Sequence, residues 1–221
     1  MNCFSQLENG IFATKKNLEI LSEKENANIL VLSDSHGAAN TLFSIIEKFG
    51  KKADALIFAG DGIYDLLSVM EKCRANFSEK KQLPPVIGFV KGNNDSFSAS
   101  TSFEKNIKVP SKIVLKAGNR NILVTHGHSE GVYYDFSTLE ATAQVFGANA
   151  VIFGHTHVPT EMLSKVYLLN PGSIGYPRHK SPPSFAMLEI LGPNINSIFY
   201  KIQFEKKLEF IPYFPEPFYG F

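Results

Sequence analysis

The chain lacks the features that mark several classes of protein. It has no tryptophan among 221 residues and two cysteines, Cys3 and Cys73, which form no zinc or disulfide framework. No apolar run approaches the roughly 20 residues that span a bilayer. The first residues, MNCFSQLENGIFATKK, have neither the basic start nor the apolar stretch of a secretory signal. These absences predict a cytoplasmic protein, in a reducing compartment, with no membrane partner.

An excess of charge of one sign is also missing. Lys plus Arg number 22 and Asp plus Glu 21, so no overall field favours nucleic acid or anionic membranes. Hydrophobic residues make up 44% and charged residues 19%, the composition of a folded protein. The length suits one domain, or two small ones. Aromatic residues are plentiful instead, with 19 Phe and 8 Tyr.

The order of apolar runs and amphipathic segments predicts an α/β chain. Buried strands are expected at 28–33, 55–59, 86–90 and 150–153, and a hairpin at 113–116 and 121–125. Helices are expected before Gly50, at about 64–75 and at about 136–146. The later part reads as strands at 162–169, 184–191 and 195–204. This mixture predicts two sheets packed face to face with helices outside.

Side chains of the kinds that bind metals follow five of the apolar runs. The clusters are Asp34-Ser35-His36, Gly60-Asp61, Gly92-Asn93-Asn94-Asp95, His126-Gly127-His128 and Gly154-His155-Thr156-His157. Ligands of open α/β sheets lie outside the carboxyl ends of the strands, so five strands in one sheet would bring these clusters together. One such cluster is more often a cap or a core residue. Five sets of buried carboxylates and imidazoles would destabilise the fold unless they were paired or metal-bound, and they predict a shared metal site.

The ligand types narrow the chemistry. Oxygen and imidazole donors without thiolate suit Mn, Fe, Ni, Co or Zn. Seven candidate ligands are too many for one ion with an open position, and they suit two ions about 3.5–4 Å apart that share a carboxylate. Two divalent cations facing only two carboxylates leave excess positive charge. That excess favours a bridging hydroxide and an anionic, phosphate-like substrate.

These motifs, in this order, resemble those of the calcineurin-like metallophosphoesterases over about residues 28–173. The THGH spelling at 125–128, the Asn170-Pro171-Gly172-Ser173 turn and the short length look most like the small YfcE-type phosphodiesterases. The resemblance implies an α/β (α+β) fold: a four-layer αββα sandwich of two mixed β-sheets flanked by helices. It also implies one metallophosphoesterase domain, residues 28–221, behind an N-terminal extension, residues 1–27.

The resemblance also implies a role for each ligand. Asp34, His36, Asp61 and His157 would bind one metal ion, and Asp61, Asn93, His126 and His155 the second, with Asp61 bridging. Two divalent ions per chain are expected, Mn²⁺ being preferred over Fe, Ni, Co or Zn. Asp61, Asn93 and His128 are the expected catalytic residues, although His128 is read equally well as support for the ligands.

One position departs from the wider superfamily, in which a histidine often follows the asparagine of the third cluster. Asn94 stands there, and an amide cannot deliver a proton at neutral pH. Esters with poor leaving groups are therefore expected to react slowly. Asp95 is expected to be a structural hydrogen-bond acceptor.

Several segments have two interpretations. The turn at 170–173 either supports the metals or is only a turn, and Tyr133 and Tyr134 line the pocket or pack elsewhere. The basic run Arg178-His179-Lys180 is a solvated loop or a grip on phosphate. The aromatic tail, about 205–221, packs onto its own domain or forms a homo-oligomer contact.

The preferred function is a hydrolase, a dinuclear metal-dependent phosphodiesterase that acts on small phosphate esters by attack of a metal-bridging hydroxide. The alternative is a protein-binding scaffold like the eukaryotic retromer subunit Vps29, whose fold resembles that of this family. Scaffold descendants tend to lose ligands, and this chain keeps all seven, which favours the enzyme. The balanced charge gives no specific support for a nucleic-acid substrate.

Overall fold

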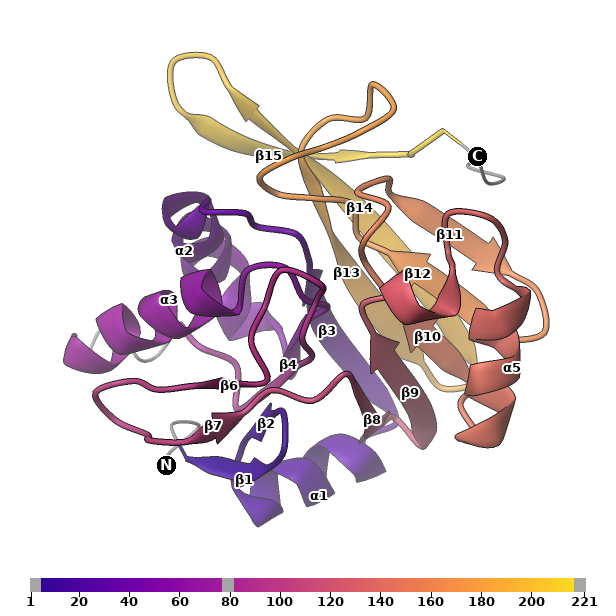
Figure 1. The fold of residues 1–221 in the computed structure, drawn as a ribbon, viewed down its shortest axis with the longest axis horizontal. Coiled ribbons are helices and arrows are strands. Elements are labelled where there is room, and N and C mark those ends of the chain that lie inside the picture. Colours follow the sequence, from indigo (N-terminus) through magenta and orange to yellow (C-terminus); the bar gives the residue numbers. More distant parts are fainter. Residues whose placement is uncertain (1–4, 77–81, 217–221) are drawn as a thin grey trace.

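Two β-sheets form the body of the protein in a computed structural model that describes residues 5–76 and 82–216 (Figure 1). The larger sheet has the strand order β1 (Gln6–Glu8), β2 (Ile11–Phe12), β5 (Val86–Phe89), β4 (Ala55–Phe58), β3 (Asn26–Leu32), β13 (Ser184–Leu191), β14 (Asn194–Phe204) and β15 (Leu208–Tyr213). The smaller sheet has the order β11 (Thr160–Leu163), β12 (Tyr167–Asn170), β10 (Ala150–Ile152), β9 (Arg120–Thr125) and β8 (Lys112–Ala117). A separate ladder pairs β6 (Ser98–Ala99) with β7 (Ile107–Lys108).

Both sheets mix parallel and antiparallel pairing. In the larger sheet β3, β4 and β5 are parallel, and in the smaller sheet β9, β10 and β12 are parallel. Every residue of β4 and β5 is buried, as expected for parallel strands covered on both faces. The helices α2 (Ala39–Phe49) and α3 (Ile63–Ala75) follow β3 and β4, and α5 (Ser137–Val145) follows β9. Because the strands themselves are buried, polar side chains can reach solvent or a ligand only where these strands end.

Three apolar clusters fill the spaces between layers. Alternate residues of β3 point to opposite faces: Leu30 and Leu32 join a cluster with α2 and α3, whereas Ile29 and Val31 face the smaller sheet. The third cluster lies between the smaller sheet and α5 and includes Leu139 and Phe153. The layers therefore run helix, sheet, sheet, helix, which confirms the predicted αββα sandwich.

The segment before residue 28 completes one edge of the larger sheet. β2 pairs antiparallel with β5, with Ile11 opposite Gly88, and the Phe12 side chain is fully buried. The helix α1 (Lys15–Glu23) is capped by Thr14, whose hydroxyl accepts a hydrogen bond from Asn17 N at 3.1 Å. This segment is therefore packed into the body. The division into an extension and a domain at residue 28 stays a prediction.

The predicted strand at 162–169 is wrong. The chain forms two antiparallel strands there, β11 and β12, with Leu163 opposite Tyr167. Ser164 and Lys165 interrupt the apolar pattern, and Ser164 N donates to Val166 O at 3.2 Å to close the turn. By contrast, the predicted hairpin at 113–125 is confirmed as β8 and β9.

The described part of the aromatic tail packs onto its own domain. β15 pairs with β14, and the Phe210 ring lies 5.7 Å from that of Phe49 and 5.6 Å from that of Phe185. Phe214 is 98% exposed, and residues 217–221 lie outside the described residues. A homo-oligomer contact stays a prediction. Across the described ranges, no helix has both the length and the apolarity to span a bilayer.

Candidate metal centre

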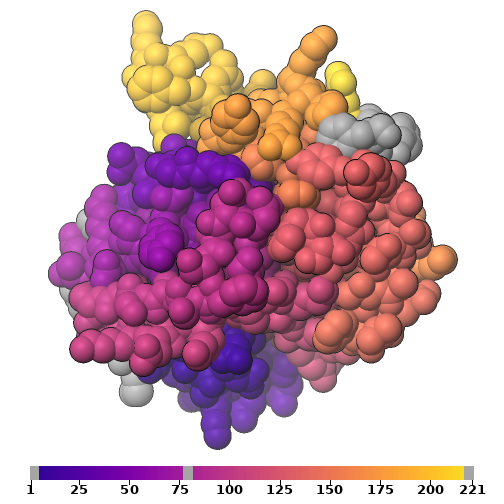
Figure 2. Space-filling model, viewed as in Figure 1, coloured from indigo at the N-terminus to yellow at the C-terminus, as the bar shows by residue number. Residues whose placement is uncertain are grey.

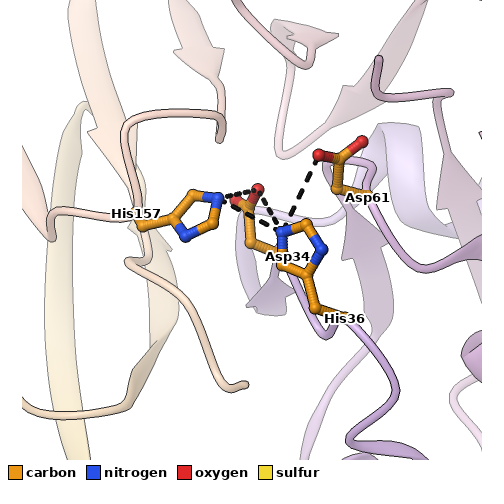
Figure 3. Close-up of side chains that lie close together, drawn as sticks. All are labelled: Asp34, His36, Asp61 and His157. Atoms are coloured by element: carbon orange, nitrogen blue, oxygen red, sulfur yellow. Dashed lines mark hydrogen bonds and ion pairs between the residues drawn. The ribbon is translucent and has the colours of Figure 1, made fainter. Parts of the chain in front are cut away.

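The five predicted clusters meet at one place, but they come from both sheets. Three follow β3, β4 and β5 of the larger sheet, and two follow β9 and β10 of the smaller one. The clusters therefore converge although their strands do not share one sheet. The two sheets pack face to face with these strand ends on the same side. Figure 3 shows side chains from both sheets pointing toward one another.

Four side chains form the tightest group. Asp34, His36, Asp61 and His157 have ligand atoms that all lie within 4.8 Å of one another. Asp34 Oδ1 lies 3.1 Å from His157 Nε2 and 3.8 Å from His36 Nε2, and Asp61 Oδ2 lies 3.8 Å from His36 Nε2 (Figure 3). This is the set that the resemblance assigns to the first metal ion.

His126 and His155 extend the group. His126 Nε2 lies 3.5 Å from Asp61 Oδ2 and 3.9 Å from Asp34 Oδ1. The His155 ring centroid lies 5.1 Å from that of His126. Asp61 Oδ2 thus has one histidine of each predicted set within 3.8 Å, and Asp34 Oδ1 has the same two within 3.9 Å, so both carboxylates lie where the two predicted sets meet.

The asparagine that touches Asp61 is Asn94. Its side-chain Nδ2 donates to Asp61 Oδ2 at 2.6 Å, and its backbone N donates to Asp61 Oδ1 at 2.8 Å. Asn93 is exposed in the same turn, and its role as a ligand stays a prediction. The sequence pattern alone indicates no hydrogen-bonding role for Asn94. The repeated asparagine of Gly92-Asn93-Asn94 was the available signal.

Asp95 holds the Asp61 loop in place. Its carboxylate accepts four backbone hydrogen bonds, from Asp61 N at 2.7 Å, Gly62 N at 3.0 Å, Ile63 N at 3.0 Å and Gly92 N at 2.9 Å. These amides include the first turn of α3, so Asp95 also caps that helix from a distant loop. The predicted structural role of Asp95 is confirmed.

Asp34 is held by one carboxylate oxygen and leaves the other toward the centre. Its Oδ2 accepts from Ser33 Oγ at 2.6 Å and from His155 N at 3.2 Å, a bond that links the two sheets. Its backbone O accepts from Ser173 Oγ at 2.6 Å. Asn170 Nδ2 donates to Gly154 O at 2.7 Å. The turn at 170–173 therefore supports the loops that carry the predicted ligands.

Backbone carbonyls orient two of the histidines. His126 Nδ1 lies 2.7 Å from Ala59 O, and His157 Nδ1 lies 2.5 Å from Tyr176 O. Since a carbonyl only accepts, Nδ1 must carry the proton in each ring. In this tautomer the lone pair of Nε2 faces the centre whenever Nε2 carries no proton, which is the arrangement a metal-binding histidine requires.

The backbone at the strand ends is strained. Five predicted ligands have positive φ angles, in the left-handed region that residues with a Cβ rarely adopt: Asp34 (54°), His36 (43°), Asp61 (55°), His155 (68°) and His157 (62°). Each such residue costs on the order of 1–3 kcal/mol, and such strain gathers at functional sites. At these residues the backbone turns directly after the strand, so that the side chains of the different loops point toward one another.

Glycines make room for the carboxylates. A Cβ on Gly92 would lie 2.0 Å from Asp61 Oδ1, and one on Gly154 would lie 2.7 Å from Asp34 Oδ2. Both distances are shorter than real contacts of a Cβ. The glycine of each motif is therefore required by the approach of the neighbouring carboxylate.

The charges of the group suit cation binding. Burial alone would raise the pKa of both carboxyls, but hydrogen bonds and charges from the histidines outweigh it. They place the pKa of Asp34 below its usual range and lower that of Asp61 to about 2. Burial, together with the charge of His126, lowers the pKa of His155 to about 4, so this ring is neutral at pH 7. Burial and the charges of His126 and Lys91 also lower the pKa of His128.

Two buried polar atoms at the centre indicate which kind of ligand it can bind. Asp34 Oδ1 and His126 Nε2 are buried and have no hydrogen-bond partner among the described residues. A buried unsatisfied polar group costs about 1–3 kcal/mol. Both atoms are electron-pair donors aimed at the same space, and a divalent cation would satisfy them. The residues therefore fit a metal ion.

The family comparison agrees with this geometry. Residues 28–192 match the family model described as the calcineurin-like phosphoesterase superfamily domain. The chain belongs to this superfamily. A relative in Bacillus subtilis (strain 168), named probable metallophosphoesterase YsnB, is 32% identical over 167 residues, which are 74% of this chain and 84% of that protein. Phosphodiesterase YfcE of Escherichia coli (strain K12) is 28% identical over 167 residues, or 73% of this chain and 86% of YfcE.

Solved structures share the fold. A predicted phosphoesterase from Streptococcus pneumoniae TIGR4 has a TM-score of 0.61 and 26% identity, covering 86% of this chain and 99% of its own. Vps29 from Entamoeba histolytica, solved in complex with Zn²⁺, has a TM-score of 0.58 and 22% identity, covering 84% of this chain and 98% of its own. At that identity the second likeness concerns the fold alone.

Two cavities lie away from the centre. One of about 610 Å³ is lined by β11, β12 and the β13–β14 turn, and one of about 490 Å³ lies between the loop at 179–182 and the tail. None of the predicted ligands lines either cavity. The centre itself reaches the surface at His36, which is exposed.

Proposed function

We propose that this protein is a dinuclear metal-dependent phosphodiesterase that hydrolyses small phosphate esters. The observation that carries the proposal is the position of Asp61. Its Oδ2 lies 3.8 Å from His36 Nε2 and 3.5 Å from His126 Nε2, between the two predicted ligand sets. A carboxylate with a pKa lowered to about 2 is charged at neutral pH and suited to two cations at once.

The two ion sites would share Asp61. Asp34, His36 and His157 would complete the first, and Asn93, His126 and His155 the second. Bound divalent ions, Mn²⁺ by preference, would supply Lewis-acid polarisation of the phosphoryl oxygens and acidify water. The neutral state of His155 fits this assignment, because a metal-binding imidazole must be deprotonated.

The reaction adds the oxygen of water to phosphorus and breaks one ester P–O bond. The products are a phosphate monoester and an alcohol or phenol, which takes up a proton if it leaves as an anion. Asn94 holds no acidic proton, and its amide is hydrogen-bonded to Asp61. His128 is the remaining candidate donor, since its ring lies 5.4 Å from that of His126. Because the pKa of His128 is lowered, little of its ring carries the extra proton at pH 7, and it can donate a proton only rarely.

A scaffold of the Vps29 type is the second candidate, because of the structural likeness. Metal binding alone does not separate the two, since that Vps29 structure itself contains Zn²⁺. Hydrolysis does. The carboxylates and imidazoles retained at both proposed sites support the enzyme. A cytoplasmic location is proposed with it, supported by the scarcity of cysteine, which is limited to Cys3 and Cys73.

The test is reconstitution from metal-free protein. Protein stripped with a chelator and checked by elemental analysis should not hydrolyse bis(p-nitrophenyl) phosphate. Addition of Mn²⁺ should restore turnover and load two ions per chain. Full turnover by the stripped protein would refute metal dependence. Two bound ions without hydrolysis of any phosphate ester would favour the scaffold.

A further inference from the structure

Tyr176 stands at the edge of the proposed metal centre with its ring open to solvent. Its ring centroid lies 6.4 Å from that of His36 and 6.1 Å from that of His157, at interplanar angles of 71° and 89°. The residue is 63% exposed. An aromatic ring held edge-on to two predicted ligands, with so much of its surface exposed, is placed to stack on a flat group of a bound substrate.

The backbone of Tyr176 is fixed although its ring is exposed. Its carbonyl receives the Nδ1 proton of His157, and its N donates to Ser173 Oγ at 2.7 Å. The Ser173 hydroxyl in turn donates to Asp34 O at 2.6 Å. The backbone that carries the ring is thus attached to two predicted metal ligands, His157 and Asp34. A ring with a purely solvating role would not need this attachment.

Arg178, two residues later, brings a positive charge to the same side of the centre. Its guanidinium donates to the Tyr133 hydroxyl and lies 5.8 Å from the Tyr133 ring. Tyr133 donates to His155 O at 2.8 Å, and its ring centroid lies 4.7 Å from that of His155. No carboxylate in the described part of the chain forms an ion pair with Arg178. Its guanidinium therefore lies against Tyr133, which packs on His155, and its charge is exposed and available to an anion.

From this pair we infer the substrate class: a small phosphodiester that carries a flat heteroaromatic ring, as nucleotide esters do. The inference rests on the proposed phosphodiesterase function. Tyr176 stacks on the base, and Arg178 binds a non-bridging phosphate oxygen, for which its fork of N–H donors is suited.

A single nucleotide fits better than a nucleic-acid strand. A strand is held mainly by a track of basic residues along its phosphates. The chain has 22 basic and 21 acidic residues, and the basic run beside Tyr176 is short, with Arg178 and Lys180 as its arginine and lysine members. The arrangement therefore matches one base and one phosphate.

Two esters with the same leaving group test the inference. Thymidine 5′-(p-nitrophenyl phosphate) and methyl p-nitrophenyl phosphate release the same phenol, so their ratio of kcat/KM reports the group that stays behind. The Mn²⁺-loaded parent should prefer the thymidine ester by about tenfold, a typical effect of one stacked base. Tyr176→Ala should bring the ratio within about twofold of one, and Tyr176→Phe should preserve it.

Variants of Arg178 separate charge from stacking. Arg178→Met should raise KM for both esters alike, by about tenfold, with little change in kcat, and Arg178→Lys should recover part of the loss. Phe204→Ala is the control. Phe204 is 75% exposed at the end of β14, in the hairpin with β15 that projects from the body (Figure 2). The Phe204→Ala substitution should change neither the ratio of kcat/KM for the two esters nor the KM of either ester.

A binding measurement separates failure of this inference from failure of the proposed function. Calorimetry compares AMP with ribose 5-phosphate on the Mn²⁺-loaded parent and on Tyr176→Ala. Tighter binding of AMP that depends on Tyr176 supports the subsite even if neither ester is hydrolysed. Hydrolysis of both esters with equal kcat/KM, and equal affinity for AMP and ribose 5-phosphate, would overturn the subsite while leaving the phosphodiesterase intact.

Discussion

The side chain of Asn94 donates to Asp61 Oδ2 at 2.6 Å, so the residue after Asn93 supports the proposed bridging carboxylate. A histidine at this position would present an acidic N–H, whereas the amide presents a neutral one. The same hydrogen bond therefore orients Asp61 and leaves this position without an acid for the leaving group.

The rate of hydrolysis should consequently fall steeply as the pKa of the leaving group rises. Aryl diesters leave without a proton, whereas alkoxides need one. Asn94→His should raise the rate on alkyl diesters by about 10²-fold, the lower end of the usual effect of a general acid, and should change aryl diesters little. Plots of log kcat against leaving-group pKa for parent and variant check this. A flat plot for the parent would show that another donor, such as His128, already acts.

Asp95 should contribute to stability and to metal affinity together. Asp95→Ala removes the acceptor of four backbone amides that join the Asp61 loop, α3 and Gly92. The free energy of unfolding of the metal-free protein should fall by about 1–3 kcal/mol, the usual cost of leaving such donors unsatisfied. Metal affinity should fall as well, because Asp61 loses its fixed position. Urea denaturation and calorimetric titration with Mn²⁺ measure the two effects.

Asp135→Ala is the matched control for Asp95→Ala. Asp135 accepts from Ser137 N at 2.8 Å and from Ser137 Oγ at 2.5 Å, at the start of α5 and at the far end of the loop that begins with His126. Its removal should lower the melting temperature without changing Mn²⁺ affinity. Equal losses of Mn²⁺ affinity in both variants would show that Asp95 has no specific link to the centre.

The metal-free protein should lose stability through His155 as the pH falls from 6.5 to about 4. Burial, then the charge of His126, lowers the folded pKa of His155 from 6.5 to about 4. Between these values the unfolded chain binds a proton that the folded chain does not, so acid favours unfolding. Raised pKa values at His36 and His126 act in the opposite direction, but they are present in parent and variant alike. His155→Gln should therefore show a smaller loss of unfolding free energy between pH 6.5 and 4 in urea titrations. Parallel curves would contradict the lowered pKa.

The sequence was informative where structure is local. Strands such as β3 and β4 are continuous apolar runs because both faces are buried, and the ligands follow because only strand ends are open. Each ligand motif is likewise a short stretch of sequence that can be recognised without knowing its distant neighbours. These two properties allowed the layers and the clusters to be predicted.

Pairing and packing between distant segments were not predictable. Nothing near His126 or His155 says that β9 and β10 belong to a second sheet, because that depends on pairing with β8 and β12. The contact of Arg178 with Tyr133 joins segments 45 residues apart and leaves no periodic pattern. The hairpin of β11 and β12 was predicted as one strand, because Ser164 and Lys165 interrupt the apolar pattern too briefly to indicate a turn.

Asp61→Asn should weaken both proposed ion sites at once. The substitution keeps the shape but removes the charge that faces His36 and His126. It also sets a new NH₂ group against one of two donors, the side-chain or the backbone N–H group of Asn94. We expect fewer than one tightly bound ion per chain and a fall in kcat of at least about 10²-fold, since one carboxylate charge close to two cations is worth several kcal/mol. Asn93→Ala should mainly weaken the second ion and leave the first bound.

The fold should survive both substitutions, because the strands pack through apolar clusters on each face. Circular dichroism of the metal-free proteins checks this. Elemental analysis after gel filtration gives the ions per chain, and hydrolysis of bis(p-nitrophenyl) phosphate gives the rate. Two retained ions and parental kcat in Asp61→Asn would rule out the bridge, since no ligand shared by both ions is dispensable. Loss of both ions in Asn93→Ala, with an unchanged spectrum, would instead mean that the two sites bind as one unit and that Asp61 is not their only link.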